Sequence, residues 1–194
     1  MHQPVIRTFF ACELSPDILK KIRDLTIDLK TTLAQQVKWV STQNMHLTIQ
    51  FLGEFKQSDI PVIKDKLQQA LASIKPFGLH IQGMGAFPST SRAKVIWLGI
   101  DSQPALVDLF HLVTSQTKRL GYPPEGRPFS AHITLGRVKS DVSPADLAKI
   151  KSTILSREKI DIGMQIVKDL HFIKSDLTPG GPQYTDIFIL PFSG

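Results

Sequence analysis

The chain has 194 residues, of which 42% are hydrophobic and 21% are charged, and its formal net charge is +6. This balance predicts a folded globular protein and excludes a disordered chain. The positive charge fits an ordinary basic protein and equally a partner rich in phosphate, so charge alone does not decide between them.

Cysteine usage and the lack of long apolar runs indicate where the protein works. Cys12 is the single cysteine, so no disulfide can form within the chain, and we expect a reducing compartment. The first ten residues lack the basic start and long apolar core of a signal peptide. No apolar run approaches the ~18 residues that cross a bilayer. We therefore expect a cytoplasmic protein without a membrane partner.

The first half of the chain alternates β-rich and amphipathic segments. Ser15 and Pro16 are typical of a helix start, as N-cap and first helical residue, and Gly53 is expected to end a strand. In order, the sequence predicts a strand at 5–14, a helix at 15–36, an extended piece at 37–40, a strand at 45–52, a helix at 58–74 and a strand at 77–87.

The same pattern then starts again. Ser143 and Pro144 form a second helix start of the kind seen at Ser15 and Pro16. The predicted elements are a strand at 93–100, a helix at 101–121, a loop at 122–130, a strand at 131–138, a helix at 143–155, one long strand at 160–175, a turn at 177–183 and a strand at 184–192.

Equivalent positions in the two halves are similarly spaced. Pro16 precedes His46 by 30 residues, and Pro104 precedes His132 by 28. We therefore expect a single bilobal domain over 1–194 that arose by internal duplication, with the repeat boundary near 88–92. The expected fold is α+β, with two pseudo-symmetric lobes that enclose a central groove, each a mainly antiparallel sheet with helices on its outer face. A parallel doubly wound sheet is the alternative, but no glycine-rich phosphate loop follows the first strand.

Two strands carry the same short pattern, "HLTI" at 46–49 and "HITL" at 132–135. Because side chains alternate across a strand, His46 and Thr48 share one face, and so do His132 and Thr134. The aliphatic residues between them face the core. If the lobes are related by duplication, the two histidine faces line the two walls of one groove.

A histidine on each wall, without a serine or cysteine nucleophile, favours paired acid–base catalysis. One imidazole takes a proton from the attacking group while the other donates a proton to the leaving oxygen. In-line displacement at phosphorus suits this arrangement, with Thr48 and Thr134 donating hydrogen bonds to the non-bridging oxygens. A metal site would need three or four ligands, and neither motif strand has one beyond its histidine.

Three further residues are candidates for substrate contacts. Arg137 lies on the second motif strand and Arg127 in the loop before it, where either guanidinium could bind phosphate. Phe129, beside the second motif, is a candidate for stacking on a base. His80 and His171 are expected to be packing or surface residues.

The paired motifs resemble those of the 2H phosphoesterase superfamily. The segments "FFACELS", "VKWVSTQNMHLTIQFLGE", "RPFSAHITLGRVK" and "PGGPQYTDIFIL" are similar to the bacterial and archaeal RNA 2′,3′-cyclic phosphodiesterase family, also called 2′-5′ RNA ligase. This resemblance covers nearly the whole chain. It implies hydrolysis of an RNA 2′,3′-cyclic phosphate end to a 2′-phosphomonoester without a metal or other cofactor, and reversible 2′-5′ joining of RNA ends.

The resemblance also implies that His46 donates a proton to the leaving O3′ and that His132 accepts one from water. The residues by themselves allow the opposite assignment. They also leave two other functions open, a 2H enzyme for a small cyclic nucleotide or ADP-ribose cyclic phosphate, and a non-catalytic RNA-end binding module. We expect an RNA partner with a 2′,3′-cyclic phosphate end, tRNA halves among the candidates, and a monomeric protein.

Overall fold

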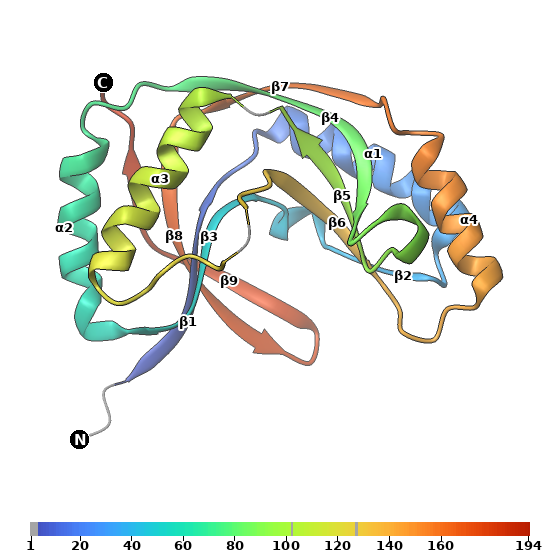
Figure 1. The fold of residues 1–194 in the computed structure, drawn as a ribbon, viewed down its shortest axis with the longest axis horizontal. Helices are drawn as coiled ribbons and strands as arrows, with labels where there is room; N and C mark the ends of the chain where they lie inside the picture. Colours follow the sequence, from blue (N-terminus) through green and yellow to red (C-terminus); the bar gives the residue numbers. More distant parts are fainter. Residues whose placement is uncertain (1–3, 102, 127) are drawn as a thin grey trace.

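Two antiparallel sheets form the frame of the protein (Figure 1). The computed structural model describes residues 4–101, 103–126 and 128–194. The first sheet has the strand order β3-β1-β8-β9, and the second has the order β2-β6-β5-β4-β7. The strands are β1 Val5–Cys12, β2 Val37–Trp39, β3 Leu47–Lys56, β4 Phe77–Phe87, β5 Val95–Ile100, β6 His132–Val138, β7 Asp161–Val167, β8 Asp169–Thr178 and β9 Gly181–Pro191.

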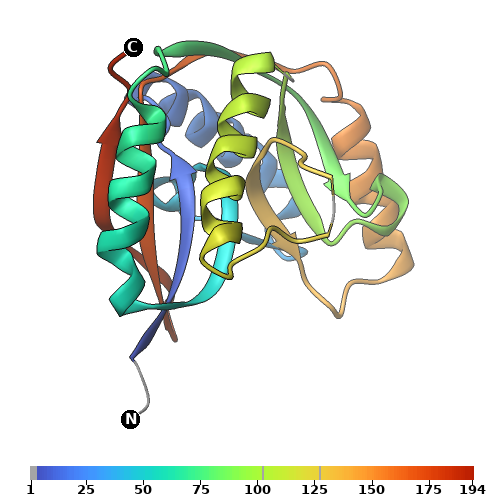
Figure 2. The same cartoon turned by 60° about the vertical axis from the view of Figure 1, so that its left-hand side comes forward.

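In the described part of the chain, four α-helices cover the outer faces of these sheets, two on each. They are α1 Pro16–Leu33, α2 Ile60–Leu71, α3 Pro104–Arg119 and α4 Pro144–Leu155, with single 3₁₀ turns at Thr42–Asn44, Gln57–Asp59 and Thr90–Arg92. Buried residues of α2 and α3 pack on the first sheet, and those of α1 and α4 pack on the second. Figure 2 shows α2 and α3 side by side in front of the first sheet. The predicted α+β, two-lobed architecture is confirmed.

Helix starts follow the local sequence signals. The Ser15 hydroxyl accepts a hydrogen bond from the Ile18 backbone N–H at 3.4 Å, and Ser143 forms a full capping box with Asp146. Both serines thus satisfy backbone donors that the first helical turn leaves unpaired.

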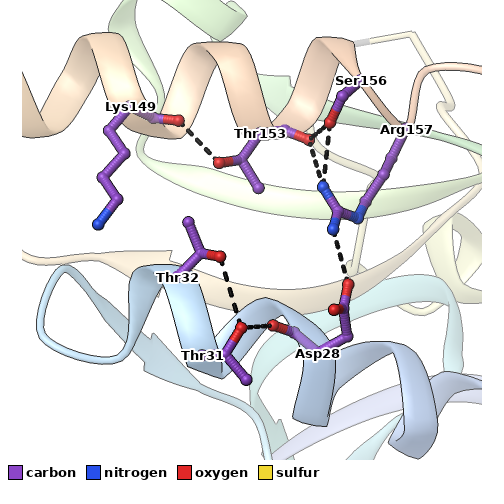
Figure 3. A network of polar contacts seen from close by, with 7 residues as sticks. All are labelled: Asp28, Thr31, Thr32, Lys149, Thr153, Ser156 and Arg157. Carbon is purple, nitrogen blue, oxygen red and sulfur yellow. Dashed lines mark hydrogen bonds and ion pairs between the residues drawn. The ribbon is translucent and has the colours of Figure 1, made fainter.

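Helices α1 and α4 are joined across the outside of the second lobe (Figure 3). Arg157, just past α4, donates a hydrogen bond to the Asp28 carboxylate on α1 at 2.6 Å. The same guanidinium reaches the Thr153 carbonyl oxygen at 3.3 Å and the Ser156 hydroxyl at 3.0 Å. One side chain therefore closes the end of α4 and links it to α1.

Each half of the chain contributes strands to both sheets. Strand β4 of the first half pairs with β5 of the second half, and β8 of the second half pairs with β1 of the first half. Each sheet therefore contains strands from both halves, and the lobes are tied together by backbone hydrogen bonds.

Three predicted segments were wrong at their boundaries. The turn predicted at 177–183 is confined to residues 179–180, because β8 and β9 pair to the end of their hairpin. The segment 160–175 is not one strand, because the chain breaks at Lys168 so that β7 joins the second sheet and β8 the first. Gly53 does not end its strand but lies inside β3 with φ of 67°. Glycine adopts this conformation readily, and it lies at a register shift opposite Thr8 and Phe9. Among the described residues, no helix is long and apolar enough to cross a membrane.

Candidate functional site

The two motif histidines lie near each other, at the start of one strand in each sheet. His46 immediately precedes β3 and His132 opens β6, and these two strands, one from each sheet, approach each other in space. The charge of His132 is close enough to lower the pKa of His46. The structure thus brings together two side chains that lie in different lobes.

Both imidazoles are held by the same local hydrogen bond. The Nδ1 atom of His46 lies 2.9 Å from the carbonyl oxygen of Asn44, and that of His132 lies 2.7 Å from the carbonyl oxygen of Ser130. A carbonyl oxygen only accepts, so Nδ1 carries the proton in each ring. In the neutral ring, Nε2 is then the atom that can take up a proton.

The two rings differ in their surroundings. His46 stacks on Phe9 at 4.7 Å between ring centroids, and the Tyr184 ring stands edge-on to it at 5.4 Å. Burial lowers the pKa of His46 to about 4, an effect opposed by the hydrogen bond to Asn44 and reinforced by His132. His132 instead meets only the edge of one described ring, that of Phe87, at 5.0 Å.

The alternation predicted for the motif strands is present at their start. Leu47 and Ile49 are buried under α2 and α3, and Ile133 and Leu135 are buried under α1 and α4. The two threonines, Thr48 and Thr134, are half-buried on the opposite, histidine-bearing face.

A bulge then interrupts both strands at the same distance from the histidine. In β3, Thr48 pairs with Ala11 but Gln50 pairs with Phe10, and in β6, Thr134 pairs with Trp97 but Gly136 pairs with Ile96. Each strand therefore contains one extra residue and places two consecutive residues toward its core.

The bulges bring the fifth residue after each histidine onto the groove face. Cross-strand partners share a face of a sheet: Phe51 pairs with Phe9, which lies beside His46, and Arg137 pairs with Val95. Strict alternation would have turned Phe51 and Arg137 toward the helices. Phe51 is 52% exposed, and Arg137 is also exposed.

Tyr184 is a site residue that the sequence did not single out. Burial raises the pKa of its hydroxyl, and the positive charges of Arg137 and Arg7 act in the opposite direction. Tyr184 therefore lies near both arginines as well as beside His46. Its place depends on the pairing of β9 with β8, a contact that no local pattern encodes.

The remaining predicted residues have different surroundings. Phe129 is half-buried and stacks on Phe110 with 4.3 Å between ring centroids, in the cluster between the first sheet and its helices. Arg127 lies outside the described residues.

Within the described residues, Glu13, His171 and Asp186 have ligand atoms that all lie within 4.8 Å of one another. This is the spacing of a group that could hold a metal ion, and neither motif histidine belongs to it. His171 is buried as expected of a packing residue, but both of its ring nitrogens lie within hydrogen-bond distance of carboxylates.

A phosphoesterase family model matches the sequence in two consecutive segments. The model, described as LigT like phosphoesterase, covers residues 13–97 and 98–184. The chain belongs to this family. Each segment contains one motif histidine together with its bulged strand.

Relatives of the family match along almost the full chain. An RNA 2′,3′-cyclic phosphodiesterase of Methanothermobacter thermautotrophicus is 30% identical, covering 94% of this chain and 96% of the relative. One of Archaeoglobus fulgidus is 31% identical, covering 94% and 98%. Among solved structures, TT0787 of Thermus thermophilus superposes with a TM-score of 0.82 at 21% identity, covering 97% of this chain and 99% of that one. Escherichia coli LigT complexed with 3′-AMP gives 0.76 at 24% identity, covering 98% and 100%.

Proposed function

We propose that the protein hydrolyses RNA 2′,3′-cyclic phosphate ends to 2′-phosphomonoesters by paired-histidine acid–base catalysis. The observation that carries this proposal is the pair of imidazoles on facing strands, each fixed through Nδ1 so that Nε2 is the reactive nitrogen. The names of the full-length relatives support the same substrate. The proposal includes an RNA partner in a reducing cytoplasm.

In the proposed reaction, water attacks phosphorus on the His132 side, and the bond between phosphorus and O3′ breaks on the His46 side. His132 takes the proton of the attacking water, and His46 gives a proton to the departing O3′. The opened ring leaves the phosphate on O2′. The reverse reaction, with an RNA 5′-hydroxyl in place of water, would join two ends through a 2′-5′ linkage.

Thr48, Thr134 and Arg137 are proposed to bind the phosphate during this reaction. Both threonines share the faces of the histidines, where their hydroxyls can donate to non-bridging oxygens. The bulge after Thr134 places Arg137 on that face too, and its guanidinium can add a charge-assisted contact. Arg127 and Phe129 stay in the proposal as an additional phosphate contact and a base contact, respectively.

The low pKa of His46 makes its role as proton donor dependent on the substrate. With a pKa of about 4 the ring is neutral at pH 7 in the free protein, whereas a donor has to be protonated. A phosphate anion bound beside the ring favours the charged imidazolium and raises this pKa. We therefore propose that the substrate itself prepares His46 to donate.

The test is hydrolysis of a short RNA with a 2′,3′-cyclic phosphate end, in EDTA, by the wild-type protein and by His46→Ala and His132→Ala. Each substitution is expected to lower kcat about 10²–10⁴-fold, the usual contribution of a general acid or base. His111→Ala, which removes an exposed histidine on α3, is the matched control and should retain activity. Unchanged turnover in either motif variant would refute the mechanism, and inactivation by EDTA would show that a metal takes part.

A parallel assay with mononucleoside 2′,3′-cyclic phosphates and with an ADP-ribose cyclic phosphate separates the substrate classes. RNA ends should be hydrolysed with the higher kcat/KM, because the basic chain adds contacts to further phosphates. Equal kcat/KM for the small substrates would favour the alternative of a small-molecule phosphodiesterase.

A further inference from the structure

A pocket of about 510 Å³ opens beside His46. It lies between the end of β1, the start of α1 and the hairpin of β8 and β9. His46 and Tyr184 line it together with two carboxylates, Glu13 and Asp186. The proposed proton transfers use only its His46 wall.

The strand pairing explains why these groups share one pocket. Tyr184 and Asp186 are two residues apart on β9 and therefore lie on the same face. Ile173 of β8 pairs with Asp186 and contributes an apolar surface to the pocket. Beside it on β8, His171 pairs with Ala11, two residues before Glu13.

His171 holds the acidic end of the pocket in place. The residue is 3% exposed, and its Nδ1 lies 3.0 Å from Asp186 Oδ1 and 3.8 Å from Glu13 Oε1. Its Nε2 lies 3.2 Å from Asp169 Oδ1. Glu13 remains 62% exposed and Asp186 37% exposed as side chains, so both still present oxygen atoms to a ligand.

The charge of this pocket restricts what an RNA end can place there. Carboxylates only accept hydrogen bonds and repel phosphate, so the acidic end of the pocket at Glu13 and Asp186 disfavours the RNA backbone. A nucleobase with adjacent N–H donors fits, since its flat apolar faces can lie along Tyr184 and Ile173. Guanine offers N1–H and the N2 amino group side by side, which matches the two oxygens of one carboxylate.

We propose that this pocket binds the base of the terminal nucleotide and selects guanine through Glu13, with Asp186 as the second acceptor. The inference rests on the proposed function, because it assumes that the cyclic phosphate lies at His46. Adenine and cytosine offer one amino group beside an acceptor, and uracil offers one N–H between two carbonyl oxygens. The expected order of preference is therefore guanine first and uracil last.

The experiment compares kcat/KM for four short RNAs that differ only in the nucleoside bearing the 2′,3′-cyclic phosphate, all in EDTA. A guanosine end should be preferred over a uridine end by roughly tenfold, the discrimination expected of one bidentate contact. Glu13→Gln, which keeps the size of the side chain, should reduce this preference to about twofold. Glu158→Gln, at an exposed position beyond α4, is the matched control and should keep it.

Three results would overturn the proposal. The first is an equal kcat/KM for all four RNA ends, and the second is a guanine preference that is unchanged in both Glu13→Gln and Asp186→Asn. The third is a guanine preference that appears only when Zn²⁺ replaces EDTA. The last would assign the carboxylates and His171 to a cation. Hydrolysis of none of the ends would instead refute the proposed function. Calorimetric binding of 2′-GMP and 2′-UMP then decides the base preference independently, because tighter binding of 2′-GMP that Glu13→Gln abolishes still supports the pocket.

Discussion

The first prediction concerns the protonation of His46 when phosphate binds. In the free protein its pKa is about 4, because the ring is buried and His132 is near. At pH 7, three units higher, only about one molecule in a thousand carries the charged ring. Protonating the His46 ring at pH 7, so that it can act as the donor, would therefore cost about 4 kcal/mol.

Bound phosphate offsets this cost by Coulomb attraction. An anion about 4 Å from the imidazolium contributes about 4 kcal/mol at an effective dielectric constant near 20, which equals about three pKa units. The pKa of His46 should therefore rise from about 4 to about 7 in the complex. Half of the bound molecules would then have a donor ready at neutral pH.

The measurement is an NMR titration of histidine-labelled protein, free and saturated with 2′-AMP. His46→Gln assigns the signal of His46 by its disappearance, and every other histidine signal is followed in the same spectra as an internal reference. A pKa of His46 that stays below about 5 in the complex would refute the reasoning. It would then favour the reverse assignment, with His46 as the base and His132 as the acid.

Three further predictions concern the frame around the site. Leu47→Ala should lower the free energy of unfolding by about 2–5 kcal/mol in urea denaturation, because the side chain is 1% exposed, and a loss below 1 kcal/mol would contradict its place in the core. Arg157→Ala should cost at most about 1 kcal/mol in the same assay, because the Asp28 carboxylate it binds is largely exposed. Gly85→Ala should lower the thermal midpoint, since a methyl group there would collide with the Trp97 indole; an unchanged midpoint would show that the indole moves aside freely.

Local sequence patterns were sufficient for the motif strands and the helix starts. The His-x-Thr sequence pattern predicts which residues face the groove as far as Thr48 and Thr134. Ser15 and Ser143 cap their helices as expected. These features depend on neighbours in the chain, where periodicity and capping act. The low pKa of His46 is different, because it depends on Phe9, Tyr184 and His132 from other strands.

Features that depend on pairing between distant strands were not predictable in this way. Strict alternation would place Arg137 on the core face, and only the bulge revealed by its pairing with Val95 shows how it reaches the groove. The break at Lys168 has the same origin, since 160–175 is uniformly β-rich but serves two sheets. Tyr184 and Asp186 lie beside His46 only because the hairpin of β8 and β9 places them in the same pocket.

Because each sheet contains strands from both halves of the chain, the first sheet can form only late in folding. Ala11 of β1 lies opposite His171 of β8, 160 positions later in the chain, so a ribosome has to produce most of the protein before this pair can form. Until then one edge of β1 stays open to other chains. Loops of this length slow folding, and the wall that carries His46 is completed last. A nascent or truncated chain that lacks β8 would thus expose an unpaired edge and possess neither the Tyr184 contact nor the pocket beside it.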